Sequence, residues 1–481
     1  MSLWEKEIKN VNKLNDDLEV DILIIGAGMT GLNTAYYLKD KKVAVIDSFK
    51  IGHGVTLNTT AKINYFQGIT YTKIDKDKAK LYLKASLEAI KNIKEIIEKE
   101  HIDCNLEKNS SYVFTSNKKE EKKLKKEILF LKENGIKIKE KKLKEFPNNL
   151  AYYVEDTYTF HPLKYLEGIV KVLKSNNIAI YENTPIIKIE EKDDYYLCYT
   201  EKYKIKASKV ILGIHYPYFI KPLFLPFKSY LEKSYIAISK INDLLNYNYI
   251  SSGNPVYSSR FYSDLKDYQV CLGESHNAAF KQNDLKHFNN VLKQFNLKEN
   301  EVIDFYSNID LITFDYLPFI GKLKENMYIS TGYNTWGMTN SIIGSKIISD
   351  LILNKKNKYV ELFNPKRLNI KLFIKMPYYV FSQMKSFIGS KLKKNKKWYN
   401  NVSFEKRNGI SLAIYKDSKG KHIVKNKCPH LGCSLIFNEV EKTWDCPCHS
   451  SRFNIDGKCI KGPSFYDISY DEIKNDDLTR N

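Results

Sequence analysis

The order of apolar and polar residues predicts a strand, a helix and a second strand close to the N-terminus. Residues 20–25 form an almost continuous apolar run, which is typical of a strand buried on both faces. Leu32, Ala35 and Leu38 then recur at helical spacing, and residues 43–46 form a second apolar run. This alternation indicates a parallel sheet with helices packed on it.

A longer segment, residues 78–140, alternates apolar and charged residues at helical spacing. We predict a helical insert that serves as scaffold, with apolar positions that include Leu81, Leu83, Leu87, Ile90, Ile93, Ile96 and Ile97. A helix is predicted at about residues 162–173. Strand-like runs follow it at residues 178–181, 185–189, 195–199 and 207–215. Further runs at residues 234–238, 256–262 and 270–273 predict an antiparallel sheet. We therefore assign residues 1–363 to one α/β region with an interleaved antiparallel β subdomain.

Residues 364–398 form a basic segment between this region and the C-terminus. Residues 364–401 contain ten lysine or arginine residues and no acidic residue. The interleaved apolar residues are Leu372, Phe373, Tyr379, Phe381, Met384, Phe387, Ile388 and Leu392. We expect a linker helix that Pro377 starts and Gly389 weakens, docked on the preceding domain. The alternative is a basic amphipathic helix that makes peripheral contact with an anionic membrane surface.

Residues 399–481 are predicted to form a small all-β domain, because strand-like runs at 410–415 and 422–426 open it. At about 150 residues per domain, a chain of 481 residues suggests two to four domains. Its formal net charge is +21, but lysine is spread through the entire chain and no nucleic-acid motif accompanies it. We therefore expect no nucleic-acid partner.

The N-terminus shows no apolar run followed by a small-residue cleavage site, so no signal peptide is expected. An uncharged apolar stretch of about 18 residues, which a transmembrane helix needs, is also missing. Cys104, Cys198 and Cys271 are scattered and indicate buried single thiols, while the other five cysteines lie between residues 428 and 459. These features favour a cytoplasmic protein.

The turn between the first strand and the first helix carries a phosphate-binding pattern. Gly26, Gly28 and Gly31 form G-x-G-x-x-G with Thr30 inside it, and Asp47 ends the second strand. The first glycine allows the tight turn, the second admits a pyrophosphate close to the backbone, and the third lets the helix pack on the strand. The acid would bind a ribose hydroxyl. In this context the pattern predicts a dinucleotide site, but it does not separate FAD from NAD.

Two short loops near the C-terminus combine cysteine with histidine at ligand spacing, Cys-x-His in the first and Cys-x-x-His in the second. Each loop also carries an extra cysteine. The six positions are Cys428, His430, Cys433, Cys446, Cys448 and His449. A zinc ion could take two cysteines and two histidines. It would, however, leave Cys433 and Cys448 without a role.

These loops resemble the iron-binding loops of Rieske [2Fe-2S] domains, and Gly462-Pro463 stands where that family has its proline loop. In such centres two thiolates hold one iron and two neutral imidazoles hold the other. The resemblance implies a set of four ligands: Cys428, His430, Cys446 and His449. It also implies a disulfide between Cys433 and Cys448 that pins the loops together. Ser450 departs from the family, which usually has glycine at that position.

Other segments resemble the FAD-dependent oxidoreductases related to glycine oxidase and D-amino-acid oxidase. Residues 54–62 match the loop that runs along the flavin, and residues 315–321 and 332–339 match the C-terminal flavin motif of that family. There, backbone amides at a helix N-terminus approach the flavin or its phosphates. The resemblance covers roughly residues 20–355 and implies FAD as the cofactor. Its implied contacts, beyond the glycine motif, are Thr56, Thr59, Thr60, Ile186, Gly332, Gly337, Met338 and Thr339.

Two redox cofactors on one chain predict an oxidoreductase in which FAD takes two electrons from a small organic substrate and the Rieske centre removes them singly. The resemblance implies an amine or amino acid oxidised at the carbon that bears nitrogen, with an unknown electron acceptor. The pocket candidates are His161, Arg260, His276, Tyr333 and Trp336. Arg260 could pair with a substrate carboxylate or lie in a surface ion pair. His161 could instead cap the helix that begins at Pro162, and Trp336 could serve packing.

Two other functions remain open from the sequence. A reductase driven by NAD(P)H normally needs a second G-x-G-x-x-G after a strand, and this chain shows none. A redox sensor or electron-carrier subunit without catalysis would not have its flavin reduced by any amine or amino acid.

Overall fold

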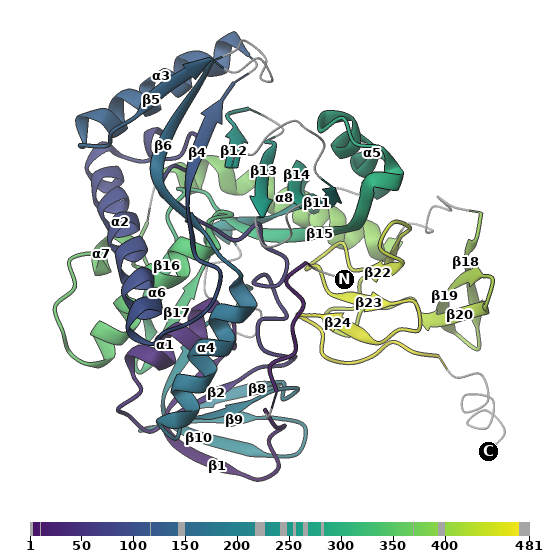
Figure 1. Cartoon of the computed structure of the whole chain (residues 1–481). Coiled ribbons are helices and arrows are strands. Elements are labelled where there is room, and N and C mark those ends of the chain that lie inside the picture. Colours follow the sequence, from purple (N-terminus) through teal and green to yellow (C-terminus); the bar gives the residue numbers. More distant parts are fainter. Residues whose placement is uncertain are drawn as a thin grey trace.

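The computed structural model has a large body with a smaller lobe beside it (Figure 1). Two large sheets and their helices make up the body, and two small sheets make up the lobe. The structure describes residues 3–9, 11–115, 117–142, 150–216, 227–240, 248–253, 256–262, 268–279, 283–368, 370–392 and 400–470.

The first sheet of the body has, within this described part, eight strands in the order β16-β17-β10-β1-β2-β7, with β8 and β9 forming a hairpin on β10. Their bounds are β1 (Leu18–Ile25), β2 (Val43–Ile46), β7 (Ala179–Tyr181), β8 (Lys188–Glu191), β9 (Tyr196–Tyr199), β10 (Lys204–Leu212), β16 (Phe319–Lys324) and β17 (Met327–Thr331). Strands β17, β10, β1, β2 and β7 run parallel. Ile25 pairs with both Ile46 and Leu212, so β1, β2 and β10 end at one edge. In open parallel sheets, cofactors bind at this edge.

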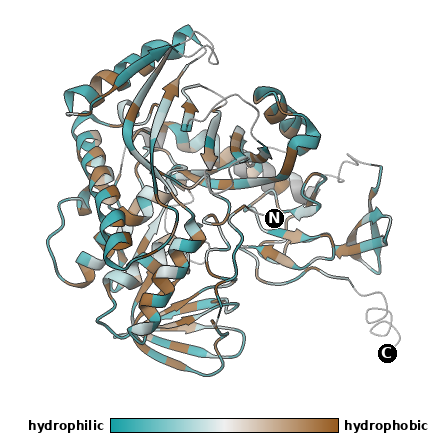
Figure 2. Cartoon of the chain, viewed as in Figure 1, coloured by the Kyte–Doolittle hydropathy of each residue, from teal (hydrophilic) through white to brown (hydrophobic). Residues whose placement is uncertain are grey.

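Three helices cover this sheet because their apolar faces need burial. They are α1 (Met29–Tyr37), α4 (Pro162–Ser175) and α6 (Gly337–Ile352), and α1 packs against both of the others. Leu32, Ile169 and Ile342 are completely buried between them. In Figure 2, brown segments lie along the strands of this sheet, and the helices carry both brown and teal residues.

The second sheet of the body has nine strands in the described ranges, ordered β15-β11-β14-β13-β12-β4-β6-β3, with β5 on β6. The bounds are β3 (Lys62–Ile63), β4 (Glu107–Phe114), β5 (Lys139–Lys142), β6 (Leu150–Thr159), β11 (Ser229–Lys240), β12 (Asn248–Ser251), β13 (Ser258–Tyr262), β14 (Tyr268–Asn277) and β15 (Val302–Thr313). Helix α5 (Asp284–Gln294) packs on β11 and β14, and a short 3₁₀ turn, η4 (Glu299–Glu301), precedes β15. The predicted strands pair antiparallel, as expected, but the sheet is wider than expected and mixed, because β12 and β4 run parallel.

The predicted helical insert is only partly helical. After the 3₁₀ turn η1 (Tyr71–Lys73), α2 (Lys76–Lys99) begins at Asp75, whose carboxylate accepts from the backbone N–H of Asp77 and Lys78. Helix α3 (Lys118–Glu133) follows, but β4 lies between the two helices and β5 follows them. The prediction of continuous helix was wrong here because β4 pairs with β6 and β12, which are distant in the sequence.

The basic linker contains a helix that begins earlier than predicted. After the short α7 (Val360–Phe363), α8 runs Ile370–Leu392 with Pro377 inside it rather than at its start. A proline removes one backbone hydrogen bond of a helix, and this helix continues through that position. The end of the linker, residues 393–398, lies outside the described residues.

The lobe contains a three-stranded sheet, β18 (Val402–Arg407), β19 (Ile410–Asp417) and β20 (Gly420–Lys425). A four-stranded sheet follows, made of β21 (Ile436–Asn438), β22 (Thr443–Asp445), β23 (Arg452–Asn454) and β24 (Cys459–Lys461). Leu435, Trp444 and Phe453 are fully buried and form the centre of its core. The lobe is therefore all-β and has a core of its own, as predicted.

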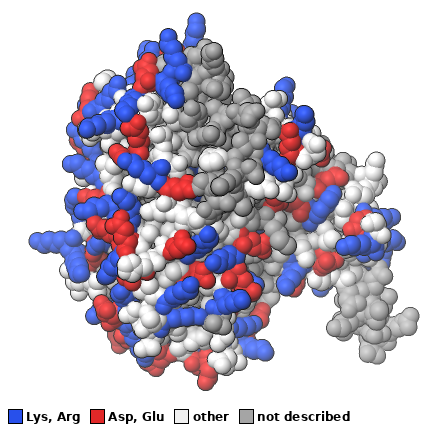
Figure 3. All heavy atoms as spheres, in the orientation of Figure 1, with Lys and Arg blue, Asp and Glu red and all other residues white. Residues whose placement is uncertain are grey.

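Positive and negative side chains are mixed over the face shown in Figure 3. On this face, therefore, the net charge of +21 does not gather into one basic patch. Among the described residues, the structure has no helix that is long and apolar enough to cross a membrane.

Candidate functional site

The turn between β1 and α1 has the backbone that a pyrophosphate site requires. Gly26 has φ +110°, and a Cβ there would lie 2.5 Å from the carbonyl oxygen of Gly213. A Cβ on Gly31 would lie 1.8 Å from the carbonyl oxygen of Gly26. Only glycine fits at either position. Asp47 follows β2, and its carboxylate accepts from the backbone N–H of Ala27 at 2.6 Å, which ties the acid to the turn.

A cavity begins at this turn and extends to the C-terminal lobe. It is lined by the β1–α1 turn, the loop after β2, residues 213–216, parts of β11 and β15, the segment 330–341 and part of residues 449–465. About 1390 Å³ of free space lies within it, part of which is open to solvent. Seven predicted cofactor residues line it: Gly26, Gly28, Thr30, Asp47, Thr56, Gly337 and Met338. Burial raises the pKa of Asp47 to about 6, although backbone N–H groups of Ala27 and Phe49 oppose this rise.

The other predicted cofactor residues are not among the described residues that line the cavity. Thr339 exchanges hydrogen bonds with the backbone of Asn64 at 3.0 and 3.1 Å, and Ile186 is 1 % exposed in the core of the first sheet. Gly332 has φ +73°, and a Cβ there would meet the Thr313 side chain at 2.8 Å. The remaining three, Gly31, Thr59 and Thr60, are likewise not among the described residues that line the cavity.

Arg260 does not reach the cavity, so the expectation that it could pair with a substrate carboxylate is corrected. Its side chain is 1 % exposed. The guanidinium donates to the carbonyl oxygens of Thr60, Ala61 and Phe160 at 3.0 to 3.1 Å and lies over the ring of Trp4 at 4.8 Å. A guanidinium has only donors, and here it fastens the loop 60–61 to the end of β6.

Two more pocket candidates, His161 and Trp336, are N-cap residues of helices and do not line the cavity. His161 is the N-cap of α4, and its Nδ1 accepts from the backbone N–H of Lys164 at 3.3 Å. Trp336 is the N-cap residue of α6 and is not among the described lining residues. The alternative of a helix cap therefore accounts for His161, whereas the side chain of Trp336 makes no capping hydrogen bond and its role stays a prediction.

The last two candidates lie near open space. Tyr333 lines the cavity, and its hydroxyl is 2.7 Å from both Thr30 Oγ1 and Ser330 Oγ. Burial raises the pKa of Tyr333 to about 12, so it keeps its proton. His276 instead lines a smaller pocket beside Cys446, with its Nε2 3.1 Å from the hydroxyl of Tyr235.

Among the charged or titratable residues of the cavity wall that were missed from the sequence are Asp310, Lys461 and His215. Asp310 of β15 and Lys461 of β24 both line the cavity, and the amide of Asn308 lies between them. Asn308 donates to Asp310 Oδ2 at 3.5 Å and accepts from Lys461 Nζ at 3.3 Å. Burial raises the pKa of Asp310 to about 7 and lowers that of Lys461 to about 8. No local signal marks either residue, because the lobe brings Lys461 to the cavity only by docking.

His215 is another residue that was missed, and its buried ring tests whether a cofactor fits the cavity. It follows β10 and lines the cavity. Its Nε2 is buried and has no hydrogen-bond partner among the described residues. Burial lowers the pKa of His215 to about 3, so the ring is neutral. A buried ring nitrogen without a partner is costly, and a polar group of FAD in the cavity would satisfy it.

The cysteine and histidine loops converge at the edge of the lobe. Cys428 and Cys446 are 1 % and 4 % exposed, and the rings of His430 and His449 lie 4.9 Å apart. Burial lowers the pKa of both histidines, to about 4 for His449, so both rings are neutral as metal ligands must be. The Nδ1 of His449 is buried without a hydrogen-bond partner in the described structure. These four side chains fit a [2Fe-2S] cluster.

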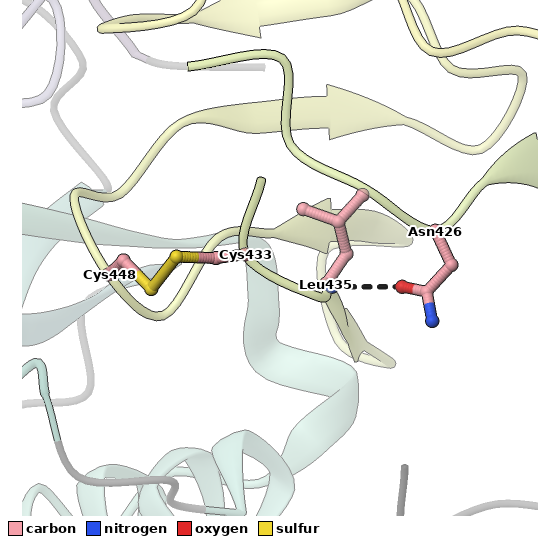
Figure 4. The surroundings of a disulfide bond; sticks show 4 residues. All are labelled: Asn426, Cys433, Leu435 and Cys448. Carbon is pink, nitrogen blue, oxygen red and sulfur yellow. Dashed lines mark hydrogen bonds between the residues drawn. A yellow bond between two sulfur atoms is a disulfide. The ribbon is translucent and has the colours of Figure 1, made fainter. Parts of the chain in front are cut away.

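The two extra cysteines form a disulfide. Cys433 and Cys448 join the two loops, and nearby Asn426 accepts from the backbone N–H of Leu435 at 2.9 Å (Figure 4). The sulfurs of Cys433, Cys446 and Cys448 lie within 4.8 Å of one another, but sulfurs in a disulfide are not thiolate ligands. The pairing implied by the family resemblance is therefore the one that the structure contains.

Ser450 explains why glycine is usual at its position. Its φ is +70°, a conformation that L-residues rarely adopt. The conformation lets its backbone N–H donate to Cys446 at 3.0 Å, while Cys446 donates to Ser451 at 2.8 Å. The loop keeps its shape at the cost of some strain in this serine.

The cluster loop forms part of the wall of the dinucleotide cavity. His449, Ser450, Lys461 and Pro463 line the same cavity as Gly26. The ring of His449 also lies 6.0 Å from that of Tyr216 on the body. The two candidate cofactor sites are therefore neighbours in this arrangement of the lobe and the body.

A buried ionic cluster holds the lobe against the second sheet. Arg452 of β23 contacts Asp445 at 2.9 and 3.0 Å and Glu441 at 2.5 Å within the lobe, and it donates to Ser307 of β15 at 2.6 Å. Lys233 of β11 reaches the same Asp445 at 3.5 Å from the other side. The side chains of this cluster are about one-tenth to one-fifth exposed, so the interface excludes most water.

The fold and these sites define a class of protein, a flavin-dependent oxidoreductase with an attached iron-sulfur domain. The family model for FAD dependent oxidoreductases matches residues 21–351, and the model for the Rieske [2Fe-2S] domain matches residues 390–469. The chain therefore belongs to this FAD-dependent oxidoreductase family and carries a C-terminal Rieske domain. It binds FAD in the first region and a [2Fe-2S] cluster in the second, and the predicted fold class and cofactors are confirmed.

The relatives agree with this assignment. A Bacillus subtilis (strain 168) protein described as a Rieske 2Fe-2S iron-sulfur protein, YhfW, is 29 % identical over 476 residues, covering 94 % of this chain and 93 % of that protein. Gamma-glutamylputrescine oxidoreductase of Escherichia coli (strain K12) is 22 % identical and covers 72 % of this chain and 86 % of that protein. Glycine oxidase from Geobacillus kaustophilus superposes with a TM-score of 0.61 at 15 % identity, covering 73 % of this chain and all of that one.

Proposed function

We propose that this protein oxidises an amine or amino-acid-like substrate at the carbon that bears nitrogen. The substrate's electron pair enters FAD, and the electrons leave singly through the [2Fe-2S] cluster to an acceptor that is not identified. The observation that carries the proposal is the shared wall, since His449 and Ser450 of the cluster loop line the same cavity as Gly26 and Asp47. Electrons then need no domain movement to pass between the two centres.

In this proposal Cys428 and Cys446 hold one iron, and His430 and His449 hold the other. His449 is the ligand that faces the cavity, because it lines the cavity and its ring lies 6.0 Å from Tyr216. The thiols lie deeper in the lobe, at 1 % and 4 % exposure. The imidazole side of the cluster is therefore the side that receives electrons from the flavin.

FAD binding rests on the β1–α1 turn. The backbone of Gly26 and Gly28 would approach the pyrophosphate, and Asp47 would accept from a ribose hydroxyl at the end of β2. Thr56 and Met338 would contact the cofactor further along the cavity, as both line it. His215 adds a polar contact that the family resemblance did not suggest.

The names of similar proteins and the charges of the cavity support the proposed substrate class. The names of two relatives point to an amine and to an amino acid, gamma-glutamylputrescine and glycine. Asp310 and Lys461 are the charged residues at the end of the cavity formed by β15 and the lobe. A carboxylate accepts only and an ammonium donates only. We therefore assign the amino group of the substrate to Asp310 and any anionic group of the substrate to Lys461.

The first experiment is an anaerobic screen of amines, amino acids and NAD(P)H against the holoprotein. Flavin absorbance reports reduction of FAD, and electron paramagnetic resonance reports reduction of the cluster. We expect one nitrogen compound to bleach the flavin and then reduce the cluster. Bleaching by NAD(P)H alone would support a reductase, and no bleaching by any compound would support an electron-carrier subunit.

The second experiment replaces His449 by Cys. A thiolate in place of a neutral imidazole should lower the cluster potential toward the value of about −400 mV seen for all-cysteine plant-type clusters. Substrate should still bleach the flavin, while cluster reduction should slow. His422→Cys is the matched control, since His422 lies on β20 of the same domain and is not among the described lining residues. Equal cluster reduction in the parent and His449→Cys would contradict the proposed route.

The assignment of Lys461 has its own test. Lys461→Met should raise KM for a substrate that carries an anionic group, with a smaller effect on kcat and on a substrate without such a group. Lys458→Met is the control, because Lys458 is exposed and lies just before β24. An unchanged KM in Lys461→Met would remove this residue from the substrate site.

A further inference from the structure

Helix α8 has two different faces. One face is docked on the second sheet of the body: Tyr379 stacks on Tyr230 and Phe314 with ring centres 4.2 and 5.0 Å apart. On the same face Ser382 is 4 % exposed, and Lys375 Nζ donates to the carbonyl oxygen of Phe314 at 3.0 Å. These contacts fix the orientation of the helix, and therefore also the direction of its opposite face.

The opposite face is an exposed apolar stripe. Its members follow each other at spacings of three and four residues, which places them on one side of a helix. They are Ile374 (74 % exposed), Tyr378 (59 %), Phe381 (68 %), Met384 (55 %) and Ile388 (46 %). Leu368, 73 % exposed, precedes the helix. Elsewhere in the described structure, large exposed apolar side chains such as Leu129 and Ile303 are scattered.

A continuous apolar surface of this kind is unfavourable in water and marks a site of association. The sequence around the stripe says which partner fits. Residues 364–401 contain ten basic residues and no acidic residue, and Lys385 is exposed one turn from Phe381 and from Ile388. A second copy of the helix would bring two basic segments together, which electrostatic repulsion disfavours. A negatively charged surface with an apolar interior complements both the lysines and the stripe.

We propose that α8 is an interfacial helix that binds the protein to membranes rich in anionic phospholipid. The side chains of the stripe enter the boundary between headgroups and acyl chains, and Lys385, which is exposed beside the stripe, faces the phosphates. The charges of α8, with Lys375 and Lys385 inside it, suit a helix that lies in the interface plane. The docked face of α8 keeps the rest of the protein attached on the aqueous side.

The test uses the full-length holoprotein and extruded vesicles of phosphatidylcholine with or without about one-third phosphatidylglycerol, followed by flotation. We expect binding to the anionic vesicles that weakens as salt is added, because salt screens the attraction to the headgroups. Ile374→Ser/Phe381→Ser/Ile388→Ser should lower the partition coefficient about tenfold or more, since each apolar side chain contributes through its buried area. Lys385→Glu should lower it and reduce the salt dependence.

The matched control is Leu129→Ser/Ile303→Ser, which removes exposed apolar side chains outside α8 and should leave binding unchanged. All variants must keep the flavin spectrum of the parent, which shows that the body is folded. Three results would overturn the proposal: no binding to anionic vesicles, equal binding of the triple variant, or equal binding to neutral vesicles. A concentration-dependent dimer in sedimentation that the triple variant abolishes would assign the stripe to self-association instead.

Discussion

Removing Lys233 should show how firmly the Rieske domain is held against the FAD region. Its Nζ lies 2.7 Å from Asp284 Oδ1 and 3.5 Å from Asp445 Oδ2, and the Lys233 and Asp284 side chains are 11 % and 10 % exposed. Asp284 begins α5 of the body, whereas Asp445 ends β22 of the lobe. Burial lowers the pKa of Lys233, but the two carboxylates outweigh this and raise it overall. The ammonium is therefore charged and stabilises both domains.

The expected loss of folding free energy in Lys233→Met depends on how well the carboxylates of Asp284 and Asp445 remain paired. Breaking a buried ion pair by removing one partner costs about 3–5 kcal/mol of folding free energy. Asp445 keeps the guanidinium of Arg452 at 2.9 and 3.0 Å, and Asp284 keeps the hydroxyl of Tyr235 at 2.5 Å. Since each carboxylate retains one donor, we expect the lower end, about 3 kcal/mol.

Urea unfolding followed by circular dichroism measures this cost. The rise in fluorescence as FAD is released reports unfolding of the FAD region separately. Lys233→Met/Asp284→Asn should lose less stability than the sum of its two single variants, because the second change removes the carboxylate left unpaired by the first. Lys322→Met is the control, as its pair with Glu325 is exposed and contributes about 1 kcal/mol at most. If Lys233→Met costs no more than Lys322→Met, the interface is not held by buried charge.

Three more changes have defined outcomes. Gly28→Val should prevent retention of FAD, measured as flavin per protein, because even a Cβ at Gly28 would lie 3.1 Å from the hydroxyl of Thr56 and the larger side chain would enter the cavity. Cys433→Ser/Cys448→Ser should loosen the cluster or lower its potential in a redox titration while its magnetic resonance spectrum keeps the same ligand set. Burial opposes protonation of His422, but the carboxylates of Asp456 and Asp417 raise its pKa overall. The charged ring therefore contributes fully to stability below about pH 6.5, and this contribution is lost as the pH rises through the raised pKa. The stability margin of the parent over His422→Gln should therefore shrink from pH 6 to pH 8.

The features that the sequence predicted well are those whose chemistry is contained in a few neighbouring residues. The glycine turn after β1 needs Gly26 and Gly31 because backbone atoms fill the space of any Cβ there. The cluster loops likewise hold their spacing within six residues each. A local requirement of this kind leaves a local pattern, and the fold class followed from the patterns on either side of it.

The features that were missed depend on pairing between distant segments. Strand β4 was read as part of a helical insert, but Ser111 pairs with Val154 of β6 and with Asn248 of β12. Strand formation there depends on partners that are far away in the sequence, so tertiary context overrides the helical pattern around it. Helix α8 begins before Pro377 although a proline is expected at a helix start.

The charged residues of the cavity were also hard to predict from the sequence, because distant segments bring them together. Arg260 was a reasonable partner for a carboxylate, yet its guanidinium is used by three backbone carbonyls, while Lys461 reaches the cavity from the Rieske domain. The domain that carries the cluster therefore also supplies part of the wall where substrate is proposed to bind. One interface then sets both the shape of the cavity and the proposed path of the electrons. A change that loosens this interface, such as Lys233→Met, should alter substrate affinity and cluster reduction together, whereas two independent domains on one chain would allow each to change alone.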